Sequence, residues 1–214
     1  MDIVGKDVQN AARSLQLAAG HVAGNETAVH AMRDLFNDAA SEGELLVDAM
    51  NVFNRLNRRA ALWNVKVPCP FLATVIINTY RTDADLFVGG ETIKSKEGTT
   101  QGDPLAMAIY SVAITPLIRR VSCADNKQLW FADDASSGAK LPALRRWWDA
   151  LVREGPAFGY FVNGDKNCLV TKGEYFEEAQ EIFHGTGVNI TVSGKRHIGA
   201  AVGTHEFVTE YVSH

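Results

Sequence analysis

The chain has 214 residues, of which 46% are hydrophobic and 21% charged, and its formal net charge is −4. This length can bury a real core within one large domain, and the composition is that of an ordinary globular protein, which excludes the disordered and membrane-embedded classes. Because the charge balance is slightly acidic, it counts against a protein that holds nucleic acid by bulk positive charge alone.

The three cysteines, Cys69, Cys123 and Cys168, are far apart in the sequence. They match neither a zinc pattern nor a disulfide framework, so we expect free thiols in a reducing compartment. No apolar run has the length of a membrane span, and the first residues lack the character of a signal peptide. We therefore expect an intracellular protein, nuclear or cytoplasmic, with no membrane partner.

Apolar periodicity and turn residues divide the chain into helices and strands, without an internal repeat or a linker. Helices are expected, in chain order, over residues 8–19, 25–36, 55–64, 71–80, 105–118, 142–158 and 174–184. Strands are expected over residues 44–48, from residue 128 into a tight turn at 133–134, and at the end of the segment 160–170, with a hairpin over 85–94 and a final strand pair at 188–192 and 197–202. This mixed order predicts an α+β fold in which an antiparallel sheet is backed by helices.

Capping residues mark the start of two of these helices. Asn25 or Thr27 is expected to cap the second helix, and Asp103 the fifth, with Pro104 where its missing N–H costs nothing. The hairpin is expected to turn at Gly89 and Gly90.

Two adjacent carboxylates, Asp133 and Asp134, end the apolar run that begins at Gln128. The pattern is that of a strand that enters a tight turn with both acids at its tip. Neighbouring strand residues point to opposite faces, so the pair serves one ligand only if the turn brings both side chains to a shared cation. Taken alone, such a pair is more often a polar hairpin tip.

A third acid, Asp48, ends an upstream β-prone run in the same way. If the two strands lie side by side, three carboxylates meet at one edge of the sheet. Such a cluster repels itself unless a divalent metal neutralises it, and ligands that are all oxygen suit Mg²⁺ best.

A polar loop bracketed by glycines precedes the fifth helix. A capped helix after a loop explains Asp103 and Pro104. It does not explain Gln101 and Gly102, a long amide beside a residue that lets the backbone approach a ligand closely.

Four segments, at residues 48–54, 101–105, 131–134 and 164–166, together resemble motifs A, B, C and D of reverse transcriptases in order and approximate spacing. The resemblance is to the enzymes of retrotransposons without long terminal repeats and of group II introns, and it covers residues 20–203. The segment at residues 197–199 is similar to the short motif E of this family. An RNA-dependent RNA polymerase would more often have Gly-Asp-Asp at the third motif.

The resemblance implies a single reverse-transcriptase-like domain over residues 1–214, with the α+β fold of a polymerase palm and abbreviated fingers. Residues 1–43 would form the helical base of the fingers, residues 44–203 the palm and residues 204–214 a C-terminal tail. With no thumb, the chain would be a fragment of a larger retroelement polyprotein or a short descendant of one.

The resemblance also implies a metal site. Asp48 and Asp133 would hold two Mg²⁺ ions, with Mn²⁺ as an alternative, and Asp134 would be a weaker or more distant partner. Lys166 would approach the triphosphate as a charge neutraliser or proton donor. Without the motif, Lys166 would be interpreted as a solvated lysine in a turn.

Three further positions would contact the substrates. Phe53 lies where the family places a bulky ring under the sugar, a ring that would collide with a 2′-hydroxyl. Without the motif, Phe53 would be interpreted as a core residue. Gln101 and Gly102 would support the incoming nucleotide and the template base.

The leading function is therefore synthesis of DNA from dNTPs on an RNA template and a DNA primer. One alternative is a catalytically silent palm that serves in nucleic-acid binding or assembly, which the acidic balance favours. The other is an RNA-dependent RNA polymerase of the same fold, against which Phe53 is the main evidence.

Overall fold

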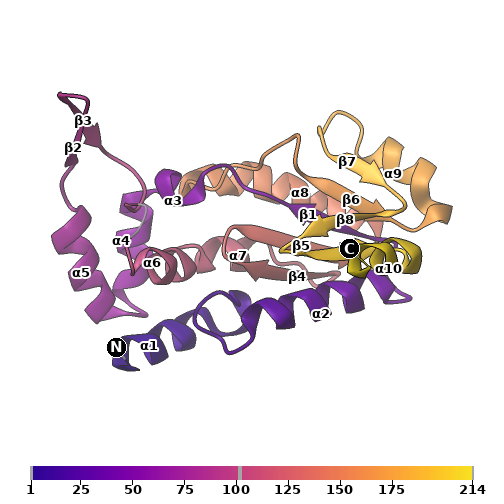
Figure 1. Ribbon diagram of the computed structural model, residues 1–214, viewed down its shortest axis with the longest axis horizontal. Coiled ribbons are helices and arrows are strands. Elements are labelled where there is room, and N and C mark those ends of the chain that lie inside the picture. Colours follow the sequence, from indigo (N-terminus) through magenta and orange to yellow (C-terminus); the bar gives the residue numbers. More distant parts are fainter. Residues whose placement is uncertain (1, 101–102, 214) are drawn as a thin grey trace.

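A computed structural model describes residues 2–100 and 103–213 of the chain. A central five-stranded sheet has the order β4-β5-β1-β6-β7 (Figure 1). Its strands are β1 (Gly43–Val47), β4 (Asn126–Phe131), β5 (Asp134–Ala139), β6 (Cys168–Thr171) and β7 (Asn189–Thr191). The predicted α+β class is observed.

The sheet is mixed, so the expectation of an antiparallel sheet was wrong at one edge. β1 pairs antiparallel with β5 and with β6, but β7 pairs parallel with β6. Two parallel neighbours need a crossover between them. Helix α9 (Phe176–Ile182) lies between β6 and β7 in the chain and provides it.

β1 is buried on both faces. Leu45 and Val47 belong to the main hydrophobic core, which the helices α6 to α8 share. Leu46 points the other way, into a second cluster with residues of α2, and Glu44 lies on that same face because side chains alternate along a strand. The centre of the sheet is therefore enclosed between two helical layers.

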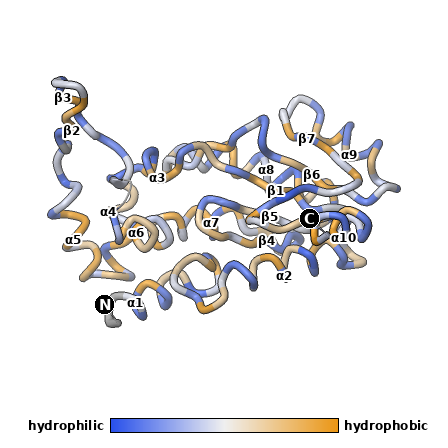
Figure 2. Tube along the Cα trace, viewed as in Figure 1, coloured by the Kyte–Doolittle hydropathy of each residue, from blue (hydrophilic) through white to orange (hydrophobic). Residues whose placement is uncertain are grey.

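The helices are α1 (Asp2–Ala12), α2 (Gly24–Asn37), α3 (Val52–Arg55), α4 (Arg58–Lys66), α5 (Pro70–Tyr80), α6 (Ala106–Ala113), α7 (Thr115–Val121), α8 (Leu141–Glu154), α9 and α10 (His205–Val212). Short 3₁₀ turns, at Arg13–Leu15, Gly155–Phe158 and Gly173–Tyr175, adjoin α1, α8 and α9. In Figure 2 hydrophobic residues, in orange, are frequent along α5, α6 and α7. None of the described helices is long and apolar enough to cross a bilayer.

Two expected helices are each divided. The helix expected over residues 55–64 breaks between α3 and α4, where Asn57 is extended and its side-chain oxygen accepts a hydrogen bond from the amide of Ala60 at 3.1 Å. The helix expected over residues 105–118 breaks between α6 and α7, because Pro116 has no N–H to continue the ladder.

Two expectations about the N-terminal segment were wrong. Residues 17–19 are not helical, since the chain is extended at Gln16 and the amide of Leu17 donates to the carbonyl of Trp130 instead. Neither Asn25 nor Thr27 caps α2, which starts one residue earlier, after Ala23.

The hairpin of β2 (Ala84–Val88) and β3 (Glu91–Ser95) is observed as predicted, with Gly89 and Gly90 at positive φ in its turn. It projects away from the rest of the molecule (Figure 1). The expected final strand pair was wrong, because β8 (Gly194–His197) instead pairs with β9 (Ala200–Gly203). Residues 204–214, expected as a tail, include α10, where the side chain of Thr204 accepts from the amide of Phe207.

Candidate active site

The two adjacent acids lie at a tight turn, as predicted. β4 ends at Phe131 and β5 begins at Asp134, and these two residues face each other across the hairpin. Ala132 has a φ of 54°. A positive φ at the first of two central residues is the pattern of a type II′ turn, where glycine is the usual residue. The backbone just before Asp133 is therefore held in a conformation that an alanine adopts only at a cost in free energy.

Asp48 reaches the same edge of the sheet. It directly follows β1, in which Val47 pairs with Ala135, the second residue of β5. The amide of Asp48 donates to the side-chain oxygen of Asn167 at 2.8 Å, and its carbonyl accepts from the amide of Asn163 at 2.9 Å. Residues on both sides of Lys166 therefore hold the backbone of Asp48.

The acids act on one another electrostatically. Burial, together with the charges of Asp133 and Asp48, raises the pKa of Asp134 to about 7. Burial also raises the pKa of Asp133, and Asp48 adds to that rise. Lys166 opposes both shifts. Its Nζ lies 3.7 Å from Oδ2 of Asp48.

The donor set suits a hard divalent cation. In the segments 2–100 and 103–213, no three His, Cys, Asp or Glu side chains are already drawn together at metal-binding spacing. The three carboxylates nevertheless offer only oxygen, and their mutual repulsion is the kind that a bound cation relieves. Asp48, Asp133 and Asp134 therefore fit Mg²⁺ by charge and by ligand chemistry.

Phe53 packs against the hydrophobic core, and its place beneath a sugar stays a prediction. It lies in α3, is half-buried, and its ring centroid is 5.2 Å from that of Tyr110. The hydroxyl of Tyr110 is buried without a hydrogen-bond partner among the described residues. Burial, and then the charges of Asp133 and Asp134, raise the pKa of Tyr110. Phe53 thus packs on a buried tyrosine whose ionisation is opposed by the two acids of the turn.

Gln101 and Gly102 lie outside the described residues, but both arms of their loop are fixed. The Tyr80 hydroxyl donates to the carboxylate of Asp103 and accepts from the amide of Thr100 at 3.1 Å. Buried Arg58 donates to the carbonyls of Ser95 at 2.6 Å and Gly98 at 2.8 Å. Asp103 does not cap α6, so that prediction was wrong: the N-cap is Leu105, with no side-chain hydrogen bond, and the Asp103 carboxylate accepts from the amide of Leu105 itself.

Sequence reasoning missed several residues that support the turn. The Tyr160 hydroxyl donates to the carbonyl of Asp133 at 3.1 Å. Nδ1 of His197 lies 3.9 Å from Oδ1 of Asp134, and burial lowers the pKa of His197 to about 4. Buried Gln16 forms two hydrogen bonds with Ala132. His197 was noted only as part of motif E, and Gln16 had no signal because it lay in an expected helix.

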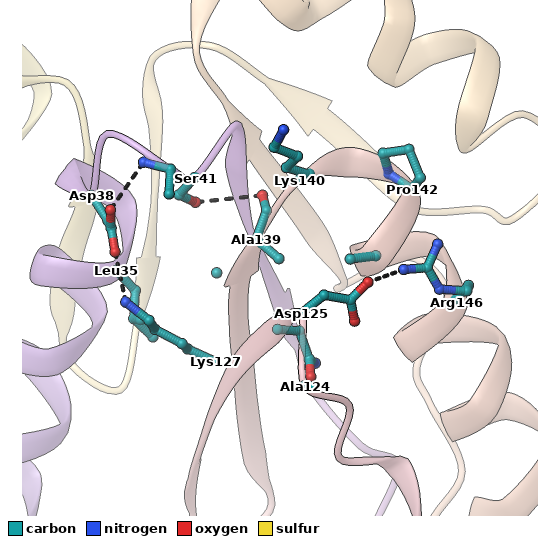
Figure 3. A pocket seen from close by; sticks show the side chains of 14 residues that line it. Leu35, Asp38, Ser41, Ala124, Asp125, Lys127, Ala139, Lys140, Pro142 and Arg146 are labelled. Atoms are coloured by element: carbon teal, nitrogen blue, oxygen red, sulfur yellow. Dashed lines mark hydrogen bonds and ion pairs between the residues drawn. The ribbon is translucent and has the colours of Figure 1, made fainter.

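A pocket of about 360 Å³ lies elsewhere, at the opposite end of β4 and β5 (Figure 3). Its sides carry two ion pairs, one between Lys127 and Asp38 and one between Arg146 and Asp125. Lys140 also lines the pocket and has no ion pair among the described residues. The pocket is separated from the acid cluster by the length of the β4–β5 hairpin.

Solved structures with a similar fold include telomerases. Apo telomerase from Candida tropicalis has a TM-score of 0.66 and 13% identity over 94% of this chain, and telomerase from Candida albicans with the TWJ fragment of telomeric RNA has 0.63 and 13% over 96%. The chain spans only 38% and 37% of those proteins. No protein-family model matches it, and no curated protein does. At this identity the likeness shows that the chain shares the fold of a part of these telomerases.

Proposed function

We propose that this chain is the palm of a reverse-transcriptase-like polymerase that extends a DNA primer on an RNA template, of the type found in retroelements. The observation that carries the proposal is the meeting of Asp48 with Asp133 and Asp134 at one edge of the sheet, where burial and mutual charge raise the pKa of Asp134 to about 7. The shared fold with telomerases supports the same class of reaction. Residues 1–43 would serve as the base of the fingers and residues 44–203 as the palm.

The three carboxylates would be the metal ligands. Bound Mg²⁺ would supply Lewis-acid chemistry, lowering the pKa of the primer 3′-hydroxyl and neutralising the triphosphate. The chain's own contribution is to fix the ligands. Asp48 is held through its backbone by Asn163 and Asn167, and Asp133 through its carbonyl by Tyr160.

Lys166 and Phe53 would act on the nucleotide. The Lys166 side chain is 65% exposed, so its ammonium group is free to move from Asp48 toward a triphosphate. Phe53 would lie beneath the sugar, where its packing on Tyr110 fixes the ring. A ring that cannot move aside rejects the extra 2′-hydroxyl of a ribonucleotide.

The distribution of charge supports a nucleic-acid partner more than the net charge does. Between Asp48 and Asp83 the chain has five Lys and Arg residues and no Asp or Glu. On α4, Arg59, Trp63 and Lys66 follow one another at helical spacing, and Trp63 is 77% exposed. Cations that bind phosphates and an aromatic ring that stacks on bases are the usual parts of a single-strand binding surface.

Primer extension tests the proposal. A DNA primer on a poly-rA template, with Mg²⁺ and either dNTPs or rNTPs, is expected to give products from dNTPs that Asp133→Asn eliminates. Products from rNTPs would instead support the RNA polymerase. Metal binding without any product would favour the silent palm, which the acidic net charge of −4 supports.

A further inference from the structure

A single buried side chain satisfies both backbone groups of the residue before Asp133. Gln16 has 0% exposure and extended backbone, and it lies in the segment between the 3₁₀ turn Arg13–Leu15 and α2. Its Oε1 accepts from the amide of Ala132 at 2.7 Å, and its Nε2 donates to the carbonyl of Ala132 at 2.9 Å. The two bonds close a ring between one amide side chain and the backbone N–H and C=O of one residue.

Ala132 is the residue in the turn that most needs such support. At a φ of 54° it has a conformation that favours glycine, and it is only 6% exposed. Its amide and carbonyl lie in the turn, between the paired residues Phe131 and Asp134, so the strand ladder does not use them. A buried amide and a buried carbonyl without partners would add a second penalty to the backbone strain.

The same segment also braces β4, because the amide of Leu17 donates to the carbonyl of Trp130 at 2.9 Å. The N-terminal segment thus makes three hydrogen bonds along the outer edge of β4, and the last two are at the turn. If the hydrogen bonds from Gln16 are lost, the backbone of Ala132 is expected to change first and that of Asp133 with it.

We infer that Gln16 is a positioning residue that holds the Asp133–Asp134 turn in place at the edge of the sheet where Asp48 also lies. Gln16 touches neither carboxylate, so its effect passes through the backbone of Ala132. The consequence for metal binding and catalysis rests on the proposed function, but the consequence for the turn does not.

The chemistry requires a neutral amide of this length. Glutamate would accept from the Ala132 amide but, when ionised, could not donate to the carbonyl, and it would bury a charge. Methionine has a similar length and fills the space without either hydrogen bond. Gln16→Met therefore removes the clamp with the least change in packing.

The experiment is amide hydrogen exchange by NMR on the full chain, with Gln9→Met on α1 as the matched control. Gln16→Met is expected to accelerate exchange of the Ala132 amide at least tenfold, and to shift the amide resonances of Asp133 and Asp134. Gln9→Met should do neither, because the side chain of Gln9 bonds to Gly20 on the surface. An unchanged Ala132 amide, or unmoved Asp133 and Asp134 resonances, would overturn the inference.

A second variant covers the case in which Gln16→Met unfolds the chain. Ala132→Gly removes the strain, so the double variant Ala132→Gly with Gln16→Met should fold. In this double variant, Gln16→Met should move the amide resonances of Asp133 and Asp134 less than it moves them in the parent chain. Shifts of full size there would contradict the proposal. Mn²⁺ affinity, measured in parallel, should fall several-fold in Gln16→Met. A parent chain that binds no Mn²⁺ would count against the proposed function, while the amide signals would still decide the role of Gln16.

Discussion

The Nζ of Lys166 lies 3.7 Å from the Oδ2 of Asp48, and the Lys166 side chain is 65% exposed. An exposed pair at this distance contributes at most about 1 kcal/mol to stability. We therefore expect Lys166→Met to change the free energy of unfolding by less than about 1 kcal/mol while it slows nucleotide incorporation at least tenfold. The measurements are urea unfolding and single-turnover primer extension. Lys94→Met, which breaks the exposed pair with Asp85, is the control and should leave incorporation unchanged.

Metal binding should depend both on Asp48, which follows β1, and on Asp133, which lies in the turn between β4 and β5. Asp48→Asn and Asp133→Asn are each expected to abolish Mn²⁺ binding measured by titration calorimetry, because each removes one charged ligand. Asp149→Asn, on the exposed face of α8, should bind as the parent does. Without metal, the site variants should be at least as stable as the parent, since they relieve repulsion among carboxylates. Unchanged binding in both site variants would refute the metal site.

The sugar preference should depend on the ring of Phe53. Phe53→Val is expected to raise the ratio of rNTP to dNTP incorporation at least tenfold, because it opens room for the 2′-hydroxyl. It should also cost about 1–3 kcal/mol of stability through the lost contact with Tyr110. Phe71→Val, at a 64% exposed position on α5, is the control for a lost phenyl ring. Equal discrimination in parent and Phe53→Val would make Phe53 a packing residue only.

Binding of single-stranded RNA should involve α4. Trp63→Ala is expected to weaken binding by about 1–3 kcal/mol, the usual value of stacking on one base. Arg59→Ala should lower the slope of log affinity against log salt by about 1. Filter binding across a salt series measures both quantities, and Arg153→Ala on α8 should leave the slope as it is. Parent binding that does not weaken as salt rises would exclude phosphate contacts as its basis.

The stability of the fold should depend on pH through Glu44. This side chain in β1 has 0% exposure, and neither of its carboxyl oxygens has a regular hydrogen bond among the described residues. Burial raises the pKa of Glu44 to about 8, although Ser136 opposes the rise. In the unfolded chain its pKa returns to the ordinary value of 4.5. Between pH 4.5 and about 8, Glu44 is therefore protonated in the folded chain and ionised in the unfolded chain. Because folding then takes up a proton, the stability of the folded state falls as pH rises through this range.

Glu44→Gln tests this pH dependence. It should remove the Glu44 contribution to the slope and make the protein more stable than the parent at pH 8, as measured by urea unfolding at several pH values. Glu42→Gln, two residues earlier, is the control and should keep the slope. A Glu44→Gln variant with the slope of the parent would show that Glu44 does not titrate in this range.

Local patterns predicted much of this fold and the position of the acid turn. The hairpin at Gly89 and Gly90 and the turn at Asp133 depend on residues adjacent in the chain, and both are observed. The meeting of Asp48 with that turn depended on a pairing of β1 with β5 that the sequence could only suggest. The residue type alone shows that Asp48, Asp133 and Asp134 offer oxygen ligands. A preference for a divalent cation could therefore be predicted before their arrangement in space was known.

The remainder depended on partners that are distant in the sequence. The parallel pairing of β7 is set by the crossover through α9, and Gln16 bonds to a residue 116 positions away. Apolar periodicity favoured a helix at Leu17, but a backbone hydrogen bond to Trp130 overrides that preference. Such contacts have no signature in the local sequence.

The central place of β1 has a consequence for how the chain is made. β1 pairs on one side with residues 135–139 and on the other with residues 168–171, so about a hundred residues must follow it before either neighbour exists. At synthesis rates of roughly 5–20 residues per second, this apolar strand waits for several seconds without partners. Glu44 is then an ordinary ionised carboxylate, and a charge within such a segment discourages aggregation. We expect Glu44→Gln, which is more stable once folded, to give a lower yield of soluble protein during synthesis.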